Sequence, residues 1–394
     1  MSQKSNKEKD NVVVQRIDDV IKNIENKNFT MYFFVADSKN IPNGSTVYAY
    51  NIAKTMMDSG YNVKMLYQLE NEYTKEEIES LTKNETPLDD SRVFVGVGEW
   101  LGSEYMEIPH LNISKEEWTV SPADFLFIPE IFSGMMFETF KHKAPCKRYV
   151  LLQNSSYVTE FIPMGVEWVN YGITDAIATT EALKNEIIEL FPYVKAQVLN
   201  PGIPDYFRKP IEPKKLIIGI VAKSTSIVNE IIKKFYWKNP VYKFVSFRYL
   251  NGFNREDYAK LLKESAIVVW VDDNTQFGYS ALEAIKTGNI LIGKIPQDIP
   301  EWMLDSEDQL TDAGVWFNNM KDIPSILASV IGAWMNDSIP EELLKAAGEL
   351  SEKYSNSTFI ENTKSITNSI IEDRISELTA YKDIVNNKKN EENK

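Results

Sequence analysis

Short apolar segments alternate with helical segments along most of this chain, and the alternation occurs in two series. MYFFVAD at 31–37 opens the first series and LIIGIVA at 216–222 opens the second. A segment that is apolar at nearly every position is typical of a parallel strand buried on both faces of its sheet. Parallel strands need long crossover connections, which helices usually supply. The pattern therefore predicts an α/β protein with two doubly wound parallel sheets.

A proline-rich stretch separates the two series. Residues 201–213 contain four prolines, which block both helices and central strands, so we expect a linker without regular structure. In parallel sheets ligands bind beyond the carboxyl ends of the strands, so the linker predicts a cleft between two domains. The expected strands before it are 31–37, 62–69, 92–97, 124–129, 147–153, 175–180 and 196–200, and those after it are 216–222, 243–250, 266–272, 289–295 and 314–317.

The two ends of the chain are expected to be helical. Apolar residues at helical spacing predict an amphipathic helix over 12–27, after a charged arm, and a long final helix over 356–385. We expect the final helix to pack back on the N-terminal domain. The expected units are an N-terminal arm and helix at 1–28, Rossmann-like domains at 29–205 and 206–355, and the final helix with a solvated tail at 356–394.

Composition narrows the function classes. A single cysteine, Cys146, excludes an intramolecular disulfide and a cysteine-rich zinc site, and His110 and His142 alone do not supply a histidine-rich metal site. A net charge of −14 opposes non-specific binding to DNA or to an anionic membrane. The N-terminus is polar and no apolar run is long enough to span a bilayer. We therefore expect a cytoplasmic protein without a transmembrane segment.

Two segments mix cations with aromatic residues. They are KHKAPCKR at 141–148 and KKFYWKNPVYKFVSFR at 233–248. Such mixtures can mark contacts with nucleic acid. A helix end that leads into a buried strand explains them better in a chain of this charge. Nucleic acid therefore stays an open but disfavoured partner.

The strongest local signal is NTQFGYSALEAIKTGNILIG at 274–293. It predicts a loop after the strand at 266–272, and then a helix that begins near Ser280. Gly278 allows close approach of the backbone, and the first N–H groups of a helix are unpaired donors, so the segment suits a diphosphate. Glu283, about one turn into the helix, is expected to be partly exposed and within reach of a ribose. The alternative is an ordinary helix N-terminus with a solvated glutamate.

The same segment resembles the donor-site signature of the retaining glycosyltransferases of family four, which have the two-domain glycosyltransferase-B fold. In that family a glutamate, and then Gly-Phe-Gly-Leu-Pro-x-x-Glu-Ala-x-x-x-Gly, follow the fourth strand of the C-terminal domain. The signature implies donor contacts for Gly278, Tyr279 and Ser280. The family's second glutamate, which binds the donor ribose, falls on Glu283. The first, which approaches the donor sugar, falls on Thr275, so either the sugar is held differently or the protein binds without catalysing.

Further segments, in the same order as in the family, extend the resemblance over most of residues 29–345. NGSTVYAYNIAKTMMDSGYNV at 43–63 resembles the family's first loop and helix. Asn43 and Gly44 stand where the family has a Gly-Gly pair, so Gly44 is implied to face the donor phosphate or the acceptor; otherwise the two residues form a simple turn. AIATTEALKNEIIELFP at 177–192 and VLNPGIPDYFRKP at 198–210 resemble the family's exit into the linker.

Two segments resemble a branch of the family that has Pro-Glu and Gln-Asn pairs near the cleft. FIPEIFSG at 127–134 supplies the first pair and VLLQNSSY at 150–157 supplies the second. The resemblance implies that Glu130, Gln153 and Asn154 lie on the acceptor side.

Cations are expected to hold the diphosphate. In the family an arginine and a lysine after the first strand of the C-terminal domain do this. IIGIVAKS at 217–224 offers Lys223 near the arginine position, where the alternative is a solvated loop lysine. The family's lysine has no clear counterpart, and Arg248 is the candidate substitute. The sequence contains no Asp-x-Asp pair, which metal-dependent glycosyltransferases of the other major fold use, so we expect no metal and no cofactor beyond the nucleotide-sugar co-substrate.

The resemblance implies an enzyme that transfers a hexosyl or pentosyl group from a nucleotide-sugar donor to a hydroxyl acceptor, with retention and without a metal. Lys223, Thr275 and Glu283 are the expected catalytic residues. The acceptor stays open among a glycan, a protein, a lipid-linked molecule and a modified nucleic acid. Two alternatives also stay open: an inactive binding or scaffold subunit of the same fold, and a phage enzyme that acts on hydroxylated DNA bases.

Overall fold

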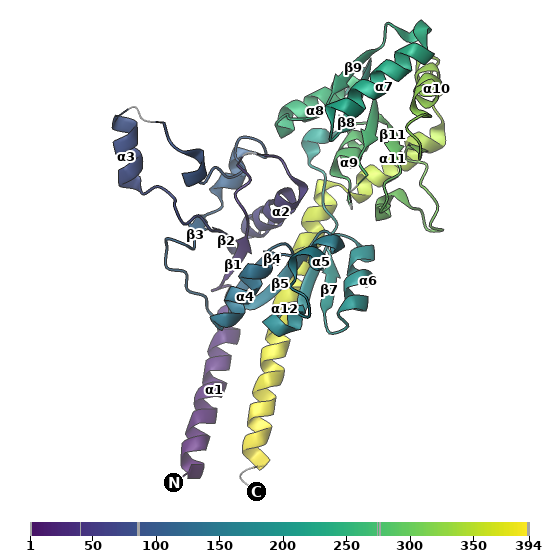
Figure 1. The fold of residues 1–394 in the computed structure, drawn as a ribbon. Helices are drawn as coiled ribbons and strands as arrows, with labels where there is room; N and C mark the ends of the chain where they lie inside the picture. The colour runs from purple at the N-terminus through teal and green to yellow at the C-terminus, as the bar shows by residue number, and fades with distance from the viewer. Residues whose placement is uncertain (1, 40, 85–86, 274, 276, 392–394) are drawn as a thin grey trace.

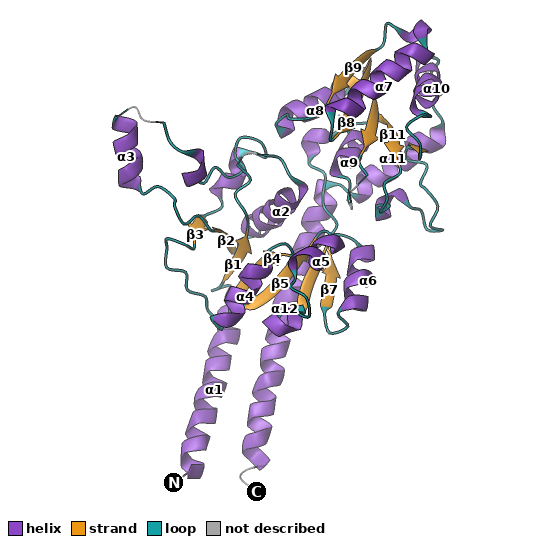
Figure 2. Cartoon of the chain, in the orientation of Figure 1, coloured by secondary structure: helices purple, strands orange, loops and turns teal. Residues whose placement is uncertain are grey.

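Two parallel sheets organise the protein (Figures 1 and 2). The computed structural model describes residues 2–39, 41–84, 87–273, 275 and 277–391. The first sheet has seven strands in the order β3-β2-β1-β4-β5-β6-β7, and every pair is parallel. Its strands are β1 (Thr30–Phe34), β2 (Asn62–Tyr67), β3 (His110–Asn112), β4 (Phe125–Pro129), β5 (Lys147–Leu152), β6 (Asp175–Ala178) and β7 (Lys195–Val198).

The second sheet has five strands in the order β12-β11-β10-β8-β9, again all parallel. Its strands are β8 (Lys215–Ala222), β9 (Ser246–Tyr249), β10 (Ser265–Val271), β11 (Ile290–Lys294) and β12 (Val315–Phe317). The α/β prediction with two parallel sheets is therefore confirmed. We call the parts of the chain that contain the first and the second sheet the N-terminal half and the C-terminal half.

Helices connect the strands and cover the sheets (Figure 1). In the N-terminal half they are α1 (Ser2–Glu25), α2 (Gly44–Asp58), α3 (Lys75–Lys83), α4 (Ser133–Lys141), α5 (Ser155–Phe161) and α6 (Glu181–Leu190). In the C-terminal half they are α7 (Thr225–Lys238), α8 (Arg255–Glu264), α9 (Tyr279–Lys286), α10 (Ile323–Met335) and α11 (Glu341–Lys353), and α12 (Asn356–Glu391) ends the chain. None of the helices in the described ranges is both long and apolar enough to cross a membrane.

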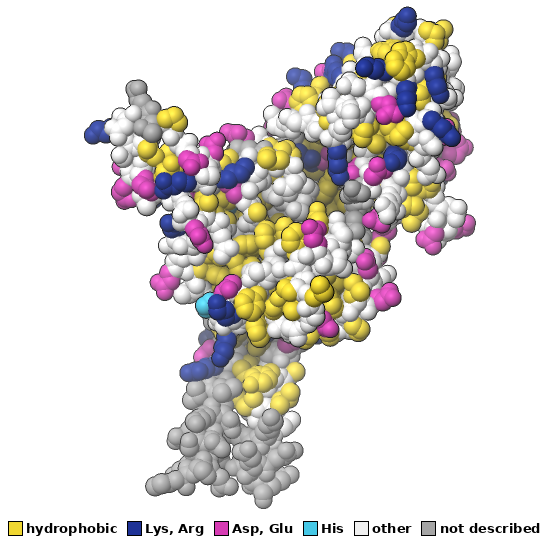
Figure 3. All heavy atoms as spheres, viewed as in Figure 1, with side chains coloured by type: hydrophobic (Ala, Val, Ile, Leu, Met, Phe, Trp, Pro, Cys, Tyr) yellow, Lys and Arg dark blue, Asp and Glu magenta, His cyan; other side chains and the backbone are white. Residues whose placement is uncertain are grey.

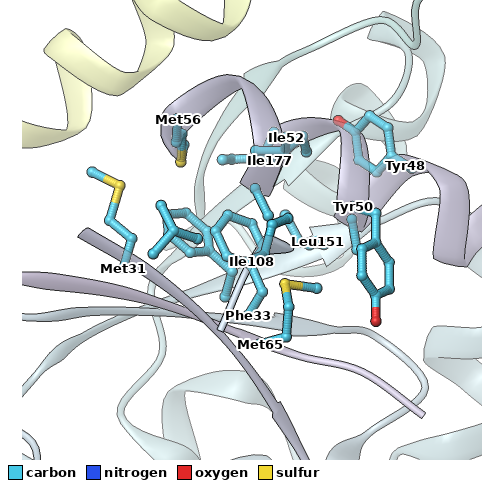
Figure 4. Packing of buried hydrophobic residues seen from close by; sticks show 14 of the residues in the cluster. Met31, Phe33, Tyr48, Tyr50, Ile52, Met56, Met65, Ile108, Leu151 and Ile177 are labelled. Carbon is cyan, nitrogen blue, oxygen red and sulfur yellow. The ribbon is translucent and has the colours of Figure 1, made fainter. Parts of the chain in front are cut away.

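The apolar segments form strands because both faces of each sheet are covered. All five residues of β1 are buried, and so are all residues of β4, its neighbour, and of β10 in the second sheet. Figure 4 shows Met31 and Phe33 of β1 packed with Ile52 of α2 and with Ile108 and Ile177. This close packing fixes the strands whose carboxyl ends carry the loops of the cleft.

The segment at 92–97 is not a strand, contrary to the prediction. Four of its backbone N–H groups bond partners other than a neighbouring strand: the Asp37 carboxylate accepts from Val95 at 3.0 Å and from Gly96 at 2.9 Å, and the N–H groups of Arg92 and Val93 donate to carbonyls of the preceding turn. Gly96 also has a positive φ of 72°, which is incompatible with extended backbone. The edge position beside β2 is taken by the short strand β3.

The two terminal helices lie side by side, and Figure 1 shows both chain ends at the same end of the molecule. Lys382 of α12 pairs with Asp18 of α1 at 2.5 Å. The first helix begins at Ser2, before the expected 12, since residues 2–11 contain neither glycine nor proline to interrupt helix growth. The last helix continues to Glu391, past the expected 385.

The last helix packs back on the N-terminal half, as predicted. Phe359, Ile366 and Ile370 are buried in the core beneath the first sheet, and Glu377 accepts from Lys147 of β5 at 2.8 Å. The chain thus crosses between the halves twice, and the crossings touch because the Ile203 N–H donates to the Tyr354 carbonyl at 2.9 Å. Because the two crossings lie side by side, they leave the facing edges of the two sheets uncovered elsewhere, and a cleft lies between these edges.

Candidate active site

A cavity of about 670 Å³ lies between the halves, within the range typical of ligand sites. Its C-terminal wall comes from the loops after β8, β9 and β10 and from the start of α9, because the carboxyl ends of neighbouring parallel strands meet at one edge. Its N-terminal wall comes from the start of α2 and the turn after β5. The predicted site residues that line it are Asn43, Gly44, Gln153, Asn154, Lys223, Thr275, Gly278, Tyr279, Ser280 and Glu283.

The start of α9 presents backbone rather than a capping side chain to the cavity. Gly278 is the N-cap, with φ 72° and ψ 47°, and it offers no side chain to the first N–H groups. A Cβ at this position would lie 3.2 Å from the Trp270 ring and 3.4 Å from the Trp302 ring. Glycine is therefore required both by the left-handed backbone and by the two rings. Residues 274 and 276 of the predicted motif lie outside the described residues.

The Glu283 carboxylate is buried in an ion pair. Its Oε1 lies 2.6 Å from Nη2 of Arg255, and the side chain of Glu283 is only 1% exposed. The expectation of a partly exposed glutamate is therefore wrong, because α9 turns this side chain toward Arg255 and the core. Glu283 still lines the cavity.

Arg255 is held from several sides at the start of α8. Its Nε donates to the Tyr206 hydroxyl at 3.3 Å, and the guanidinium lies over the Phe207 ring at 4.9 Å. Burial opposes the charge, but the Glu283 carboxylate and the Tyr206 hydroxyl together more than offset this effect, so the pKa of Arg255 is raised. The Arg255 backbone N–H donates to the Trp100 carbonyl at 3.1 Å, which joins the two halves at the cavity.

The two predicted cations have different positions. Lys223 lines the cavity, and its Nζ lies 2.8 Å from Oδ1 of Asp272, at the end of β10. Arg248 lies within β9, is absent from the cavity wall, and pairs with Glu264 at 2.6 Å. The structure therefore brings Lys223 to the site and does not bring Arg248 there.

Gly44 and Tyr279 meet where the halves face each other. A Cβ on Gly44 would lie 3.2 Å from the Tyr279 ring. Tyr279 packs against the cores of both halves, and burial strongly raises the pKa of its hydroxyl. Asn43 caps α2 by accepting from the Thr46 N–H at 2.8 Å, which fixes the position of Gly44.

Glu130 supports the N-terminal wall of the cavity from behind and is itself 2% exposed. Its Oε1 accepts from the backbone N–H groups of Gln153 at 3.0 Å and Asn154 at 2.8 Å, both of which line the cavity. Burial raises the pKa of Glu130 to about 7. The resemblance implied that Glu130 lies on the acceptor side; the structure places it behind the wall, where it holds the turn after β5.

The remaining candidates of metal and thiol chemistry lie apart from the cavity lining. His110 bonds the Tyr50 hydroxyl at 2.8 Å, and burial lowers its pKa to about 4. Cys146 is buried, which raises the pKa of its thiol to about 11. Within the described ranges, no three His, Cys, Asp or Glu side chains form a group that could hold a metal ion.

Comparisons with known proteins bear on this arrangement. No protein-family model matches the chain. A curated alpha-1,6-glucosyltransferase of Actinobacillus pleuropneumoniae serotype 7 is 24% identical over 185 residues, which make up 46% of this chain and 56% of that enzyme. The aligned part thus spans little more than half the length of this relative.

Solved structures match over much more of the chain. A glycosyltransferase from Rickettsia africae has a TM-score of 0.56 at 12% identity and covers 87% of this chain and 98% of its own. The pneumococcal O-GlcNAc transferase GtfA, solved with UDP and GlcNAc, has a TM-score of 0.55 at 10% identity, over 88% and 99%. Anabaena HepE, solved with UDP, has a TM-score of 0.54 at 11% identity, over 86% and 100%. The chain has the glycosyltransferase-B fold.

Within this glycosyltransferase-B fold, Arg255 is the residue that the sequence analysis missed. It follows Asn251-Gly252 in the loop after β9, and this loop shares an edge of the sheet with the loops of Lys223 and Gly278. The usable signal was a cation in the first helical turn after a predicted strand, at the edge where ligands bind. Its pairing with Glu283 had no local signal, since the two residues are far apart in sequence.

Proposed function

We propose that the protein is a glycosyltransferase that moves a sugar from a nucleotide-diphosphate sugar to a hydroxyl acceptor, with retention and without a metal. The observation that carries the proposal is that the start of α9, Lys223 and Glu283 line one cavity between the two halves. The curated relative is named as a glucosyltransferase, and two similar structures contain UDP, which agrees with this class of donor.

The donor would bind mainly to the C-terminal half. The diphosphate would lie at the start of α9, where N–H groups without a capping side chain and the helix dipole favour an anion. Lys223 would add a positive charge, and the diphosphate would compete with Asp272 for it. An ion pair whose lysine is 67% exposed is weak, so this competition costs little.

The ribose would lie near Glu283. Because Oε1 already pairs with Arg255, this carboxylate is pre-oriented and is not a free double acceptor. We therefore assign Arg255 as the positioning residue for Glu283. This assignment replaces the simpler interpretation of a partly exposed glutamate within reach of the ribose.

Catalysis would depend on electrostatic stabilisation of the departing diphosphate and on exclusion of water between the halves. In the front-face mechanism implied by the resemblance, the leaving phosphate takes the acceptor proton, so no separate general base is needed. The acceptor would enter past Gly44, Gln153 and Asn154. Thr275 lines the cavity at the position where the family has an acid. This difference favours the alternative function, an inactive binding or scaffold subunit of the same fold.

The direct test is incubation of the full chain with a panel of nucleotide sugars and hydroxyl acceptors, with mass spectrometry of the products. The proposal predicts release of a nucleoside diphosphate and a glycosylated acceptor. Tight nucleotide binding without turnover on any donor would support the binding subunit instead. Failure to bind any nucleoside diphosphate would overturn both.

A further inference from the structure

The end of α7 and the turn after it carry three large apolar side chains into solvent. Trp237 and Val241 are each 75% exposed, and Phe244 is 61% exposed. Other aromatic residues of the same segment face inward: Phe235 is fully buried and stacks on Tyr242. Core packing thus explains the inward-facing rings and leaves the three exposed side chains without an internal role.

Lysines are interleaved with these apolar residues. Residues 233–244 contain four lysines and no acid, in a chain whose net charge is −14. Lys234 pairs with Glu230 on the same helix, whereas Lys233, Lys238 and Lys243 are exposed and have no ion pair among the described residues. Figure 3 shows dark-blue and yellow side chains gathered together at the upper right, over α7 and α10.

We propose that this surface, the α7 tip (Trp237, Val241, Phe244, Lys233, Lys238 and Lys243), docks on an anionic lipid surface. Exposed apolar side chains beside lysines are the signature of an interfacial site: the apolar groups enter the headgroup–acyl boundary, and the lysines contact lipid phosphates. Because the chain as a whole is negatively charged, an anionic lipid surface repels most of the protein and attracts the lysines of the tip. The protein would therefore approach the lipid surface with the tip first.

The chemistry of the tip favours lipid over nucleic acid. A nucleic-acid surface would use rings that stack on bases, and Val241, one of the two most exposed of the three, has no ring to stack. Aliphatic and aromatic side chains both gain from transfer into the acyl boundary.

The position of the tip is compatible with an open cleft. Phe244 comes just before β9, whereas Asn251, Gly252 and Phe253, which line the cavity, come just after it. The tip and the cavity wall therefore lie at opposite ends of one strand. A membrane bound at the tip leaves the cavity accessible.

The test is co-sedimentation of the full chain with vesicles of phosphatidylcholine alone and of phosphatidylcholine mixed with phosphatidylglycerol. We expect binding to the mixed vesicles that weakens at high salt, and at least tenfold weaker binding to phosphatidylcholine alone. Trp237→Ala with Phe244→Ala should weaken binding at least tenfold, and so should Lys233→Gln with Lys238→Gln and Lys243→Gln. Phe161→Ala with Met164→Ala, which removes exposed apolar side chains from the N-terminal half, is the matched control and should bind like the wild type.

Quenching by brominated lipid gives a second readout, since Trp237→Phe should bind normally and lose much of the quenching. Thermal unfolding verifies that each variant is folded. Three results overturn the proposal: no binding of the wild type to mixed vesicles, equal binding of the wild type and the Trp237–Phe244 variant, or tighter binding of an oligonucleotide than of vesicles through the same residues.

Discussion

Arg255 and Glu283 form a buried ion pair beside the cavity, with Nη2 and Oε1 2.6 Å apart. The pair connects three parts of the molecule, because Glu283 belongs to α9, Arg255 begins α8, and the Arg255 N–H bonds the Trp100 carbonyl of the other half. The orientation of the proposed ribose ligand and this contact between the halves are therefore coupled through one residue, Arg255.

Glu283→Gln should lower both stability and nucleotide affinity. Removing one partner of a buried ion pair leaves an uncompensated charge, so the free energy of unfolding should fall by about 3 kcal/mol. Loss of a hydrogen bond to a charged acceptor, worth roughly 1.5–3 kcal/mol, should weaken nucleoside diphosphate binding about tenfold to a hundredfold. Chemical denaturation and calorimetric titration measure the two effects.

Glu264→Gln is the matched control, because Glu264 pairs with Arg248 at the same 2.6 Å but is 32% exposed. Glu264→Gln should lower the free energy of unfolding by less than about 1 kcal/mol. Arg255→Met combined with Glu283→Leu should regain much of the stability and none of the nucleotide affinity. A Glu283→Gln protein that unfolds like the wild type would contradict the buried pair.

Gly44→Val should lower activity at least tenfold while the protein stays folded. A branched side chain at this exposed position would strike the Tyr279 ring, which lies 3.2 Å from the site of a Cβ, and hold the halves apart. Tenfold corresponds to a barrier increase of about 1.4 kcal/mol. Steady-state kinetics are the readout.

Gly44→Ala, with the smaller intrusion, should have an intermediate effect. In a Tyr279→Ala background the ring is gone, so Gly44→Val should have almost no further effect on activity. The double variant should therefore be about as active as Tyr279→Ala alone. Unchanged kinetics in Gly44→Val would mean that this contact plays no part in turnover.

Glu130 should make stability depend on pH. Burial raises its pKa from 4.5 to about 7, so in this interval the folded protein holds the proton that the unfolded chain releases. Stability from this group is complete below about pH 4.5, falls as the pH rises, and is lost above about pH 7. The loss amounts to about 3 kcal/mol.

Glu130→Gln keeps an acceptor oxygen for Gln153 and Asn154 and does not titrate. As the pH rises from about 4.5 to about 7, the wild type should therefore lose stability relative to Glu130→Gln. The unfolding free energy of the variant minus that of the wild type should increase over this interval. Because other groups titrate in both proteins, the difference is the measured quantity. A difference that stays constant with pH would show that Glu130 is not a buried titrating carboxyl.

Transfer activity should survive treatment with EDTA. The sequence has no Asp-x-Asp pair and only two histidines. We therefore expect the start of α9 and Lys223, which line the cavity, to neutralise the diphosphate in place of a metal ion. Initial rates before and after chelation are compared with the same donor. Complete loss of activity that Mn²⁺ restores would overturn the metal-independent mechanism.

The sequence predicted most of what local patterns determine. Buried strands such as 31–37 are apolar at nearly every position, and the loops after them converge because the strands are parallel, which is why Lys223 and Gly278 could be placed at one cleft. The long last helix was predictable from its apolar stripe.

Long-range side-chain contacts determined the rest. The segment at 92–97 has the composition of a strand, but Asp37, distant in sequence, accepts from the N–H groups of Val95 and Gly96. Arg248 and Arg255 are both cations near β9, and only tertiary structure assigns one to Glu264 and the other to Glu283. Glu283 is buried because it pairs with Arg255, and no feature of the neighbouring sequence predicts this burial.

The central claim is that a nucleoside diphosphate binds at the start of α9 with Lys223 beside it. The most direct measurement is calorimetric titration of UDP, GDP, ADP and CDP into the wild type, Lys223→Ala and Arg248→Ala. The account predicts that at least one nucleotide binds the wild type, that Lys223→Ala weakens it about tenfold to a hundredfold, and that Arg248→Ala, whose cation points away to Glu264, binds as the wild type does. Equal binding by Lys223→Ala and the wild type, or loss of binding in Arg248→Ala alone, would contradict it.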